Sequence, residues 1–153
     1  MYNTIKKENN MIKKLFMVFL FSLPILASDM NMQNRELSKN DMKAQNREIV
    51  KLAAAEMSKS LPNIIDKYTK LIAVKADKTT LVYIYEINTT PKTDETVQKE
   101  DHSRMQEAVT RGTCRSSKRF LEANISLRYI YKSKNTKAEL FQFNINQESC
   151  FKI

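Results

Sequence analysis

Two cysteines, Cys114 and Cys150, are the residues of this sequence best suited to covalent chemistry. In an exported chain, two cysteines most simply form one disulfide. That bond would close a loop of about 37 residues and constrain the unfolded chain by roughly 3.5–4 kcal/mol in the loop-entropy model. The alternative is a pair of redox-active or metal-binding thiols, but there is no Cys-x-x-Cys spacing and no histidine near either residue. We therefore predict a structural disulfide.

Catalytic and metal-binding patterns are missing from the sequence. The single histidine, His102, lies in the charged run KEDHSR and is expected to be an exposed polar residue. One histidine rules out a zinc site with several histidines, and one glycine rules out a glycine-rich phosphate loop. The acidic residues are scattered, with no spacing that identifies an acid/base pair. The sequence predicts no catalytic residue, no metal site and no cofactor, and hence a protein that is not an enzyme.

Two asparagines lie in an extended N-glycosylation pattern. The sequence is EINTT around Asn88 and EANIS around Asn124. The acidic residue two positions before each asparagine makes both sites more specific than a plain Asn-x-Ser/Thr sequon, and fits the rule of bacterial N-glycosylation. Asn88 and Asn124 are therefore candidate modification sites, each at the end of an expected strand.

Four tyrosines form two Tyr-x-Tyr pairs, Tyr83 with Tyr85 and Tyr129 with Tyr131. Alternation places both members of a pair on one face of a strand. One interpretation is cross-strand aromatic packing, with each hydroxyl at the rim of the core. The other is a tyrosine-lined groove for a peptide or a glycan. The direction in which the rings point would distinguish them.

The first 28 residues are built like a cleavable secretory signal. Lys13 and Lys14 precede an uncharged run over 15–26, and the small residues Ala27 and Ser28 follow. A transmembrane anchor is the alternative, but the apolar run has about 12 residues and a bilayer requires roughly 20. A buried core helix is less consistent with a segment that is apolar on all sides. No cysteine near the cleavage point supports a lipid anchor.

Charge limits the classes of partner. The chain has 26 Lys and Arg against 17 Asp and Glu, and removal of residues 1–28 leaves a net charge of about +6 without long blocks of one sign. The basic residues do not cluster with aromatic residues, so nucleic-acid binding is not expected. We expect a protein partner in the cell envelope, with membrane contact only through the signal peptide before its cleavage.

After a polar leader over 29–40, one small α+β domain is expected over 41–153. Its fold is predicted as about four antiparallel strands in one sheet packed against two or three helices. Residues 63–68 are expected to connect the first helix to the sheet, and residues 90–100 to form a polar linker. The predicted helices are 41–61, 101–112 and 115–123, and the predicted strands are 69–76, 79–89, 125–132 and 138–145.

Residues 61–150 resemble a loosely defined group of small exported proteobacterial proteins. The pattern comprises Leu61-Pro62 with Asp66 and Thr69, Tyr83-x-Tyr85, Cys114 with Leu121, Tyr129-x-Tyr131 and Cys150. The group has no established activity, so the resemblance implies a location and a type of fold, and no functional residues.

The export signal, the single small domain and the missing chemistry together indicate a class of function. We expect a periplasmic or secreted, non-enzymatic accessory or binding protein, serving an envelope assembly such as a secretion, pilus or conjugation system. The alternative is a periplasmic inhibitor or immunity protein against an envelope hydrolase or toxin, with residues 90–100 as the plug.

Overall fold

The computed structural model describes residues 38–151. The predicted signal peptide at 1–28 and most of the polar leader therefore lie outside the described residues. Between residues 38 and 151, no helix combines the length and the apolar character needed to cross a bilayer.

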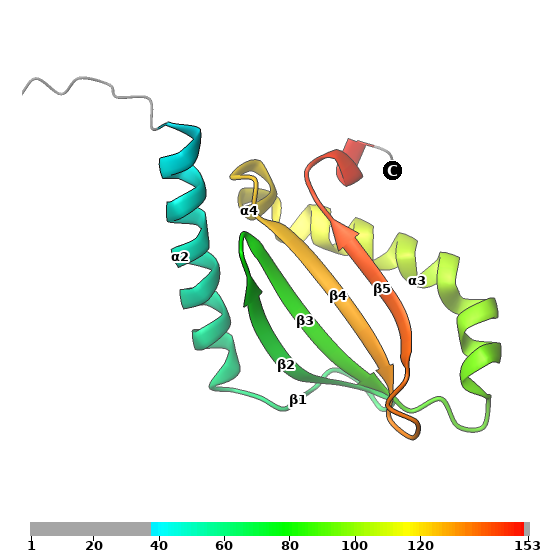
Figure 1. Ribbon diagram of the computed structural model, residues 1–153. Helices are drawn as coiled ribbons and strands as arrows, with labels where there is room; N and C mark the ends of the chain where they lie inside the picture. Colours follow the sequence, from blue (N-terminus) through cyan, green and yellow to red (C-terminus); the bar gives the residue numbers. More distant parts are fainter. Residues whose placement is uncertain (1–37, 152–153) are drawn as a thin grey trace, which may run out of the picture. The chain divides into compact units, whose positions relative to one another are not determined.

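The fold is α+β, as predicted, and it contains one five-stranded sheet where about four strands were expected (Figure 1). The additional strand is a short one in the expected connector. In chain order the elements are α2 (Lys39–Ser58), β1 (Asn63–Ile64), β2 (Thr69–Asp77), β3 (Thr80–Ile87), α3 (Asp94–Ser116), α4 (Lys118–Glu122), β4 (Ser126–Ser133), β5 (Glu139–Ile145) and the single 3-10 turn η1 (Glu148–Phe151).

The strands follow one another across the sheet in the order β1-β2-β3-β4-β5. Three neighbouring pairs are antiparallel, but β3 and β4 are parallel, with Thr80 opposite Ser126 and Ile87 opposite Ser133. The prediction of antiparallel strands was therefore wrong for this pair. The reason is the connection: α3 and α4 carry the chain back to the end of the sheet where β3 began, so β4 runs in the same direction.

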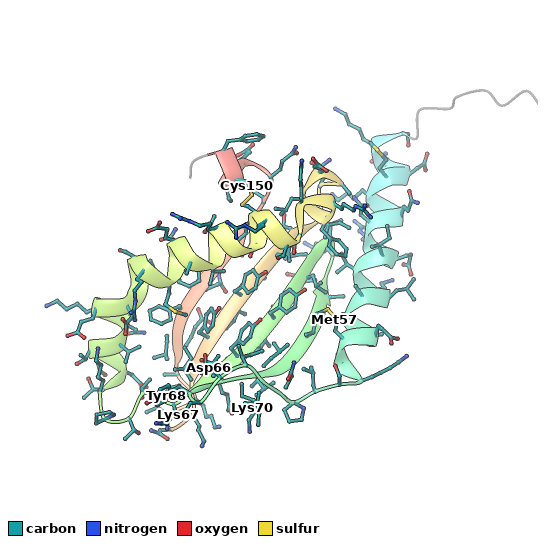
Figure 2. The ribbon with its side chains drawn as sticks, turned by 180° about the vertical axis from the view of Figure 1, so that it is seen from behind. Met57, Asp66, Lys67, Tyr68, Lys70 and Cys150 are labelled. Carbon is teal, nitrogen blue, oxygen red and sulfur yellow. A yellow bond between two sulfur atoms is a disulfide. The ribbon has the colours of Figure 1, made fainter. Side chains whose placement is uncertain are left out.

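Both long helices cover the same face of the sheet (Figures 1 and 2). Helix α2 packs on β2 and β3, whereas α3 packs on β5. The buried residues accordingly form two clusters, one containing Val50 of α2 and one containing Val97 of α3. Three partly buried aromatic residues pack against both clusters: Tyr83, Tyr85 and Phe120.

Helix α3 begins well before the predicted residue 101, so the expected polar linker over 90–100 was wrong for its last seven residues. Thr93 caps the helix by accepting a hydrogen bond from the N–H of Thr96, and Asp94 and Glu95 occupy the first turn. Both features stabilise a helix N-terminus. Val97 is the one buried residue in the first two turns, which explains why apolar periodicity did not reveal them.

In three of the connections between elements, a residue other than glycine adopts the left-handed backbone conformation. Lys78 (φ 54°), Asn124 (φ 61°) and Lys137 (φ 63°) adopt this conformation in the turns that precede β3, β4 and β5. Glycine usually takes such positions because it has no Cβ. With a single glycine in the chain, other residues occupy them.

Candidate partner-binding surface

The tyrosine row consists of Tyr83 and Tyr85 on β3 and Tyr129 and Tyr131 on β4. The parallel register places Tyr83 opposite Tyr129 and Tyr85 opposite Tyr131, so all four rings lie on the helix-covered face. Tyr83 and Tyr129 stack with their centroids 5.2 Å apart, and Tyr85 and Tyr131 with theirs 4.9 Å apart. Tyr85 also stacks on Tyr129 at 6.4 Å. The rings therefore form one continuous stack in the order 83, 129, 85, 131.

Helices α2 and α3 flank the tyrosine row on the same face of the sheet, α2 over β2 and β3 and α3 over β5 (Figure 2). Met57 of α2, labelled in the figure, accepts a hydrogen bond at its Sδ from the hydroxyl of Tyr83, at 3.7 Å. On the other side, the hydroxyl of Thr113 in α3 donates to that of Tyr129 at 2.8 Å. Sequence analysis did not identify Met57 or Thr113 as a partner of a tyrosine, because nothing in the sequence relates either residue to one.

The other two tyrosine hydroxyls have no internal partner. Within residues 38–151, the hydroxyls of Tyr85 and Tyr131 form no hydrogen bond to protein, and no buried side-chain oxygen there is left unpaired. Neither oxygen is therefore fully enclosed, and the residue Tyr131 as a whole is 7% exposed. Cross-strand packing is confirmed for the rings, and two hydroxyls have no hydrogen-bond partner within residues 38–151.

The tyrosine row is electrically neutral at physiological pH. Burial raises the pKa of Tyr83 and Tyr85 far above the ordinary tyrosine value, and neighbouring tyrosines raise it further. Burial also raises the pKa of Tyr131 to about 12, with a smaller contribution from Tyr129. Each hydroxyl keeps its proton and can both donate and accept a hydrogen bond.

The predicted disulfide is confirmed. Cys114 and Cys150 are bonded, with their Cα atoms 5.6 Å apart. Cys114 lies in the last turn of α3. The sequence had predicted instead that one helix ends at residue 112 and another begins at residue 115. Cys150 lies in η1, directly after β5. The bond thus joins the helical layer to the segment that follows the last strand.

His102 of α3 is exposed, as predicted, and its ring centroid lies 5.9 and 5.5 Å from those of Phe141 and Phe143 of β5. No group of three or more His, Cys, Asp or Glu side chains is arranged for a metal ion in the described part of the chain. The arrangement around His102 is one of packing, and the structure assigns it no chemistry.

The two candidate glycosylation sites have different surroundings. Asn124 is exposed, in the turn between α4 and β4. Asn88 is half-buried, and its side-chain oxygen accepts the N–H of Thr90. The intervening Thr89 is buried and donates a hydrogen bond to Asp94. Modification of either site stays a prediction.

Comparison with known proteins gives similarity in fold at low sequence identity. No curated protein matches the sequence. Among solved structures, a candidate secreted protein from Pseudomonas aeruginosa has a TM-score of 0.63 and 13% identity, over 71% of this chain and 96% of that one. The type 2 secretion system pilotin EpsS from Vibrio vulnificus has a TM-score of 0.61 and 14% identity, over 72% and 96% of the two chains.

A second pilotin, AspS of the type II secretion system of Vibrio cholerae, has a TM-score of 0.54 and 14% identity, over 72% of this chain and 97% of that one. At these identities the likeness concerns the fold. The family match concerns the sequence itself: residues 43–141 match DUF8479, a domain of unknown function. The chain belongs to the DUF8479 family.

Proposed function

We propose that this protein is a periplasmic, non-enzymatic accessory protein of an envelope assembly of the secretion type, and that it binds a polypeptide segment of another component on the tyrosine row. Two observations of different kinds support the assignment to the envelope. Residues 1–28 have the pattern of an export signal, and the fold resembles two pilotins of type II secretion systems.

The tyrosine row, with two hydroxyls that have no partner among the described residues, carries the proposal of binding. Tyrosine is enriched at protein interfaces because its ring supplies apolar area while its hydroxyl forms hydrogen bonds. Here the rings of Tyr83, Tyr85 and Tyr129 are only partly buried, and the hydroxyls of Tyr85 and Tyr131 have no internal partner among the described residues. The surface therefore combines apolar contact area with unused hydrogen-bonding groups.

The stacking of the rings favours a polypeptide over a glycan. A sugar that packs on a tyrosine needs a free ring face, but in this stack Tyr129 and Tyr85 each have another ring on both sides. Tyr131 has Tyr85 on one side and the ring of Phe141 nearby at 6.3 Å. Ring edges and hydroxyls remain, which suit the side chains and amide groups of a polypeptide.

Site-specific photo-crosslinking in the source bacterium tests the proposal. A photoreactive residue at Tyr85 should form a crosslink to a component of an envelope assembly, identified by mass spectrometry. The matched control carries the same residue at Leu52, which is 70% exposed on α2 outside the row. Equal capture of the same proteins from both positions would contradict the proposal, as would recovery of the protein from the cytoplasm alone.

The variant Tyr85→Phe provides a quantitative measure. It removes a hydroxyl that has no internal partner in the described part of the chain and keeps the ring in the stack, so the fold should be unaffected. Loss of one hydrogen bond of about 0.5–1.5 kcal/mol would weaken partner binding up to about tenfold. Tyr68→Phe, which changes an exposed tyrosine outside the row, should leave partner binding unchanged.

The inhibitor alternative loses the feature that suggested it. Residues 90–100 were expected to be a free loop, but Asp94–Glu100 are the first turns of α3. The segment that remains between β3 and α3 is short. It ends at Asp94, the first residue of α3, which accepts a hydrogen bond from Thr136 in the turn between β4 and β5. No other feature of the described residues favours a plug.

A further inference from the structure

The segment between α2 and β2 exposes large apolar side chains at the edge of the sheet. Ile64 is 73% exposed, and Ile65 and Tyr68 are each 51% exposed. We call these three residues the apolar tip. They lie within five positions of one another, around the short edge strand β1. Apolar side chains that gather in this way on the surface mark an interaction site.

The tip is held in place by backbone hydrogen bonds. Oδ1 of Asp66 accepts the N–H groups of Tyr68 and Thr69, at 2.7 and 2.8 Å. The carbonyl of Thr69 in turn accepts the N–H of Ile65 at 3.0 Å. The hydrogen bond from the N–H of Tyr68 makes the largest contribution and lowers the pKa of Asp66; desolvation opposes it, and the hydrogen bonds with Thr69 lower the pKa further. The tip is thus a fixed turn whose apolar side chains point outward.

A basic hollow adjoins the tip. It has a volume of about 150 Å³, and the lysines that line it are Lys67, Lys70 and Lys134. Ile64 and Tyr68 also line it, so basic and apolar groups share one surface. Figure 2 shows Lys67, Tyr68 and Lys70 together at this end of the sheet. We call the three lysines the lysine set.

The lysine set gives the hollow an excess of positive charge over the acids that line it. Within residues 38–151, none of the three lysines forms an ion pair. Two acids also line the hollow, against three lysines. Glu86 pairs with Lys137 at 2.6 Å, and Asp66 accepts the two backbone N–H groups described above. The hollow therefore attracts an anion.

We propose that the apolar tip and the lysine set together bind the surface of an anionic phospholipid bilayer. The headgroup phosphate occupies the hollow against Lys67, Lys70 and Lys134, and Ile64, Ile65 and Tyr68 enter the interfacial layer. Lysines beside exposed apolar residues are the combination by which peripheral proteins bind anionic membranes. A purely apolar protein partner would leave the three charges without a counterpart.

This inference goes beyond the proposed function and does not depend on it. The tyrosine row lies on β3 and β4, whereas the tip belongs to the β1 edge. Variants of the tip and variants of the row can therefore be tested separately. Bilayer contact at the tip would keep a periplasmic protein at the membrane after removal of its signal peptide.

Tryptophan fluorescence provides the test, because the chain contains no tryptophan. The protein is purified in the form that the cell exports, with Ile64→Trp as the reporter and Leu52→Trp as the matched control. Vesicles of phosphatidylglycerol and phosphatidylethanolamine should shift the emission of the Ile64→Trp protein to shorter wavelength. They should leave that of the Leu52→Trp protein unchanged. Any binding through the N-terminal residues is common to both proteins.

Charge reversal tests the lysine set separately. Lys67→Glu combined with Lys134→Glu should weaken vesicle binding at least about tenfold, given the attraction of each lysine to an anionic surface. Added salt should weaken the binding of the unchanged protein in the same direction. The unchanged protein should bind vesicles of phosphatidylcholine alone more weakly than vesicles that contain phosphatidylglycerol.

Several results would overturn the proposal. Two concern fluorescence: no shift in the emission of the Ile64→Trp protein with anionic vesicles, or an equal shift in that of the Leu52→Trp protein. Two concern affinity: equal binding of the unchanged protein to anionic and zwitterionic vesicles, or equal binding of the unchanged and charge-reversed proteins to anionic vesicles. Inorganic phosphate that bound the hollow while vesicles did not would show a site for a soluble phosphate instead. Photo-crosslinking from residue 64 to a protein and not to lipid would show that the tip is a protein interface.

Discussion

The ring of Tyr83 stacks on that of Tyr129 with 9° between their planes, across the parallel pair β3 and β4. This pair begins the four-ring stack, whose last ring, Tyr131, belongs to the core cluster that contains Val97. Tyr83 packs against both clusters and Tyr129 against the one that contains Val97. Because α2 and α3 cover different strands, the tyrosine row connects the two halves of the core.

The hydrogen bond between Thr113 and Tyr129 should contribute measurably to stability. Thr113 is 3% exposed, so Tyr129→Phe leaves its hydroxyl without this partner and should cost about 1–3 kcal/mol. Urea unfolding gives the free energy of each variant. In the double variant Tyr129→Phe with Thr113→Val, the loss should be less than the sum of the two single losses. Additive losses would show that the two hydroxyls do not interact.

Alkaline pH should destabilise the fold through the tyrosine row. Burial raises the pKa of Tyr131 from 10.0 to about 12, so the folded state holds the proton more tightly than the unfolded state does. This stabilisation is complete below pH 10 and is lost as the pH rises from 10 towards 12. Urea midpoints measured between these limits should fall with pH for the unchanged protein.

The matched variant for this titration is Tyr131→Phe, which removes the ionisable hydroxyl and keeps a ring in the stack. Its urea midpoint should fall less steeply over the same pH range. The absorbance of tyrosinate, measured over the same pH range, should show that the variant has one fewer tyrosine with a raised pKa. Identical pH profiles of the two proteins would contradict the pKa assignment.

Removal of the disulfide should lower stability by an amount set mainly by the unfolded chain. Cys114 and Cys150 are 36 positions apart, and closing a loop of this length is worth about 4 kcal/mol in the loop-entropy model. The protein with both cysteines replaced by alanine should unfold at a lower urea concentration. Reductant should destabilise the unchanged protein and leave the alanine protein unaffected. A reductant effect on both would point to a cause other than this bond.

Two leucines of opposite exposure separate core packing from surface effects. Leu127 of β4 is 1% exposed and belongs to the cluster that contains Val97. Leu127→Ala should cost about 2–5 kcal/mol because it removes buried methyl groups and leaves a cavity. Leu52 is 70% exposed on α2, and Leu52→Ala should change the free energy of unfolding by at most about 0.5 kcal/mol. Thermal or urea unfolding of both variants measures the difference.

Of the two glycosylation sequons, the exposed one at Asn124 should be the better acceptor. We predict that co-expression with a bacterial oligosaccharyltransferase and its lipid-linked glycan adds one glycan at Asn124, where the side chain is exposed. Asn88 should remain unmodified, since it is half-buried and bonded to Thr90. Mass spectrometry of Asn124→Gln and Asn88→Gln proteins decides the matter. A glycan that persists in Asn124→Gln would contradict the assignment.

Much of the local structure follows from the sequence because it depends on neighbouring residues. The alternation in TTLVYIYEINT predicted the strand that became β3, and the same pattern at Tyr129 and Tyr131 predicted β4. Two cysteines in a chain with an export signal predicted their bond. The first turns of α3 were missed because a polar helix start, with only Val97 buried, has no apolar period to detect.

Tertiary structure alone decided which strands became neighbours and in which direction they run. Alternation places a residue on one face of a strand, but it does not specify the strand beside it. The crossover through α3 and α4 made β3 and β4 parallel, and that register brought Tyr83 against Tyr129 and Tyr85 against Tyr131. The sequence by itself therefore determined two strands that each carry a Tyr-x-Tyr pair, one disulfide and a connector over 63–68. The folded chain turned them into a continuous aromatic stack, a bond between layers and an apolar tip beside three lysines, because each of these depends on contacts between residues far apart in the sequence.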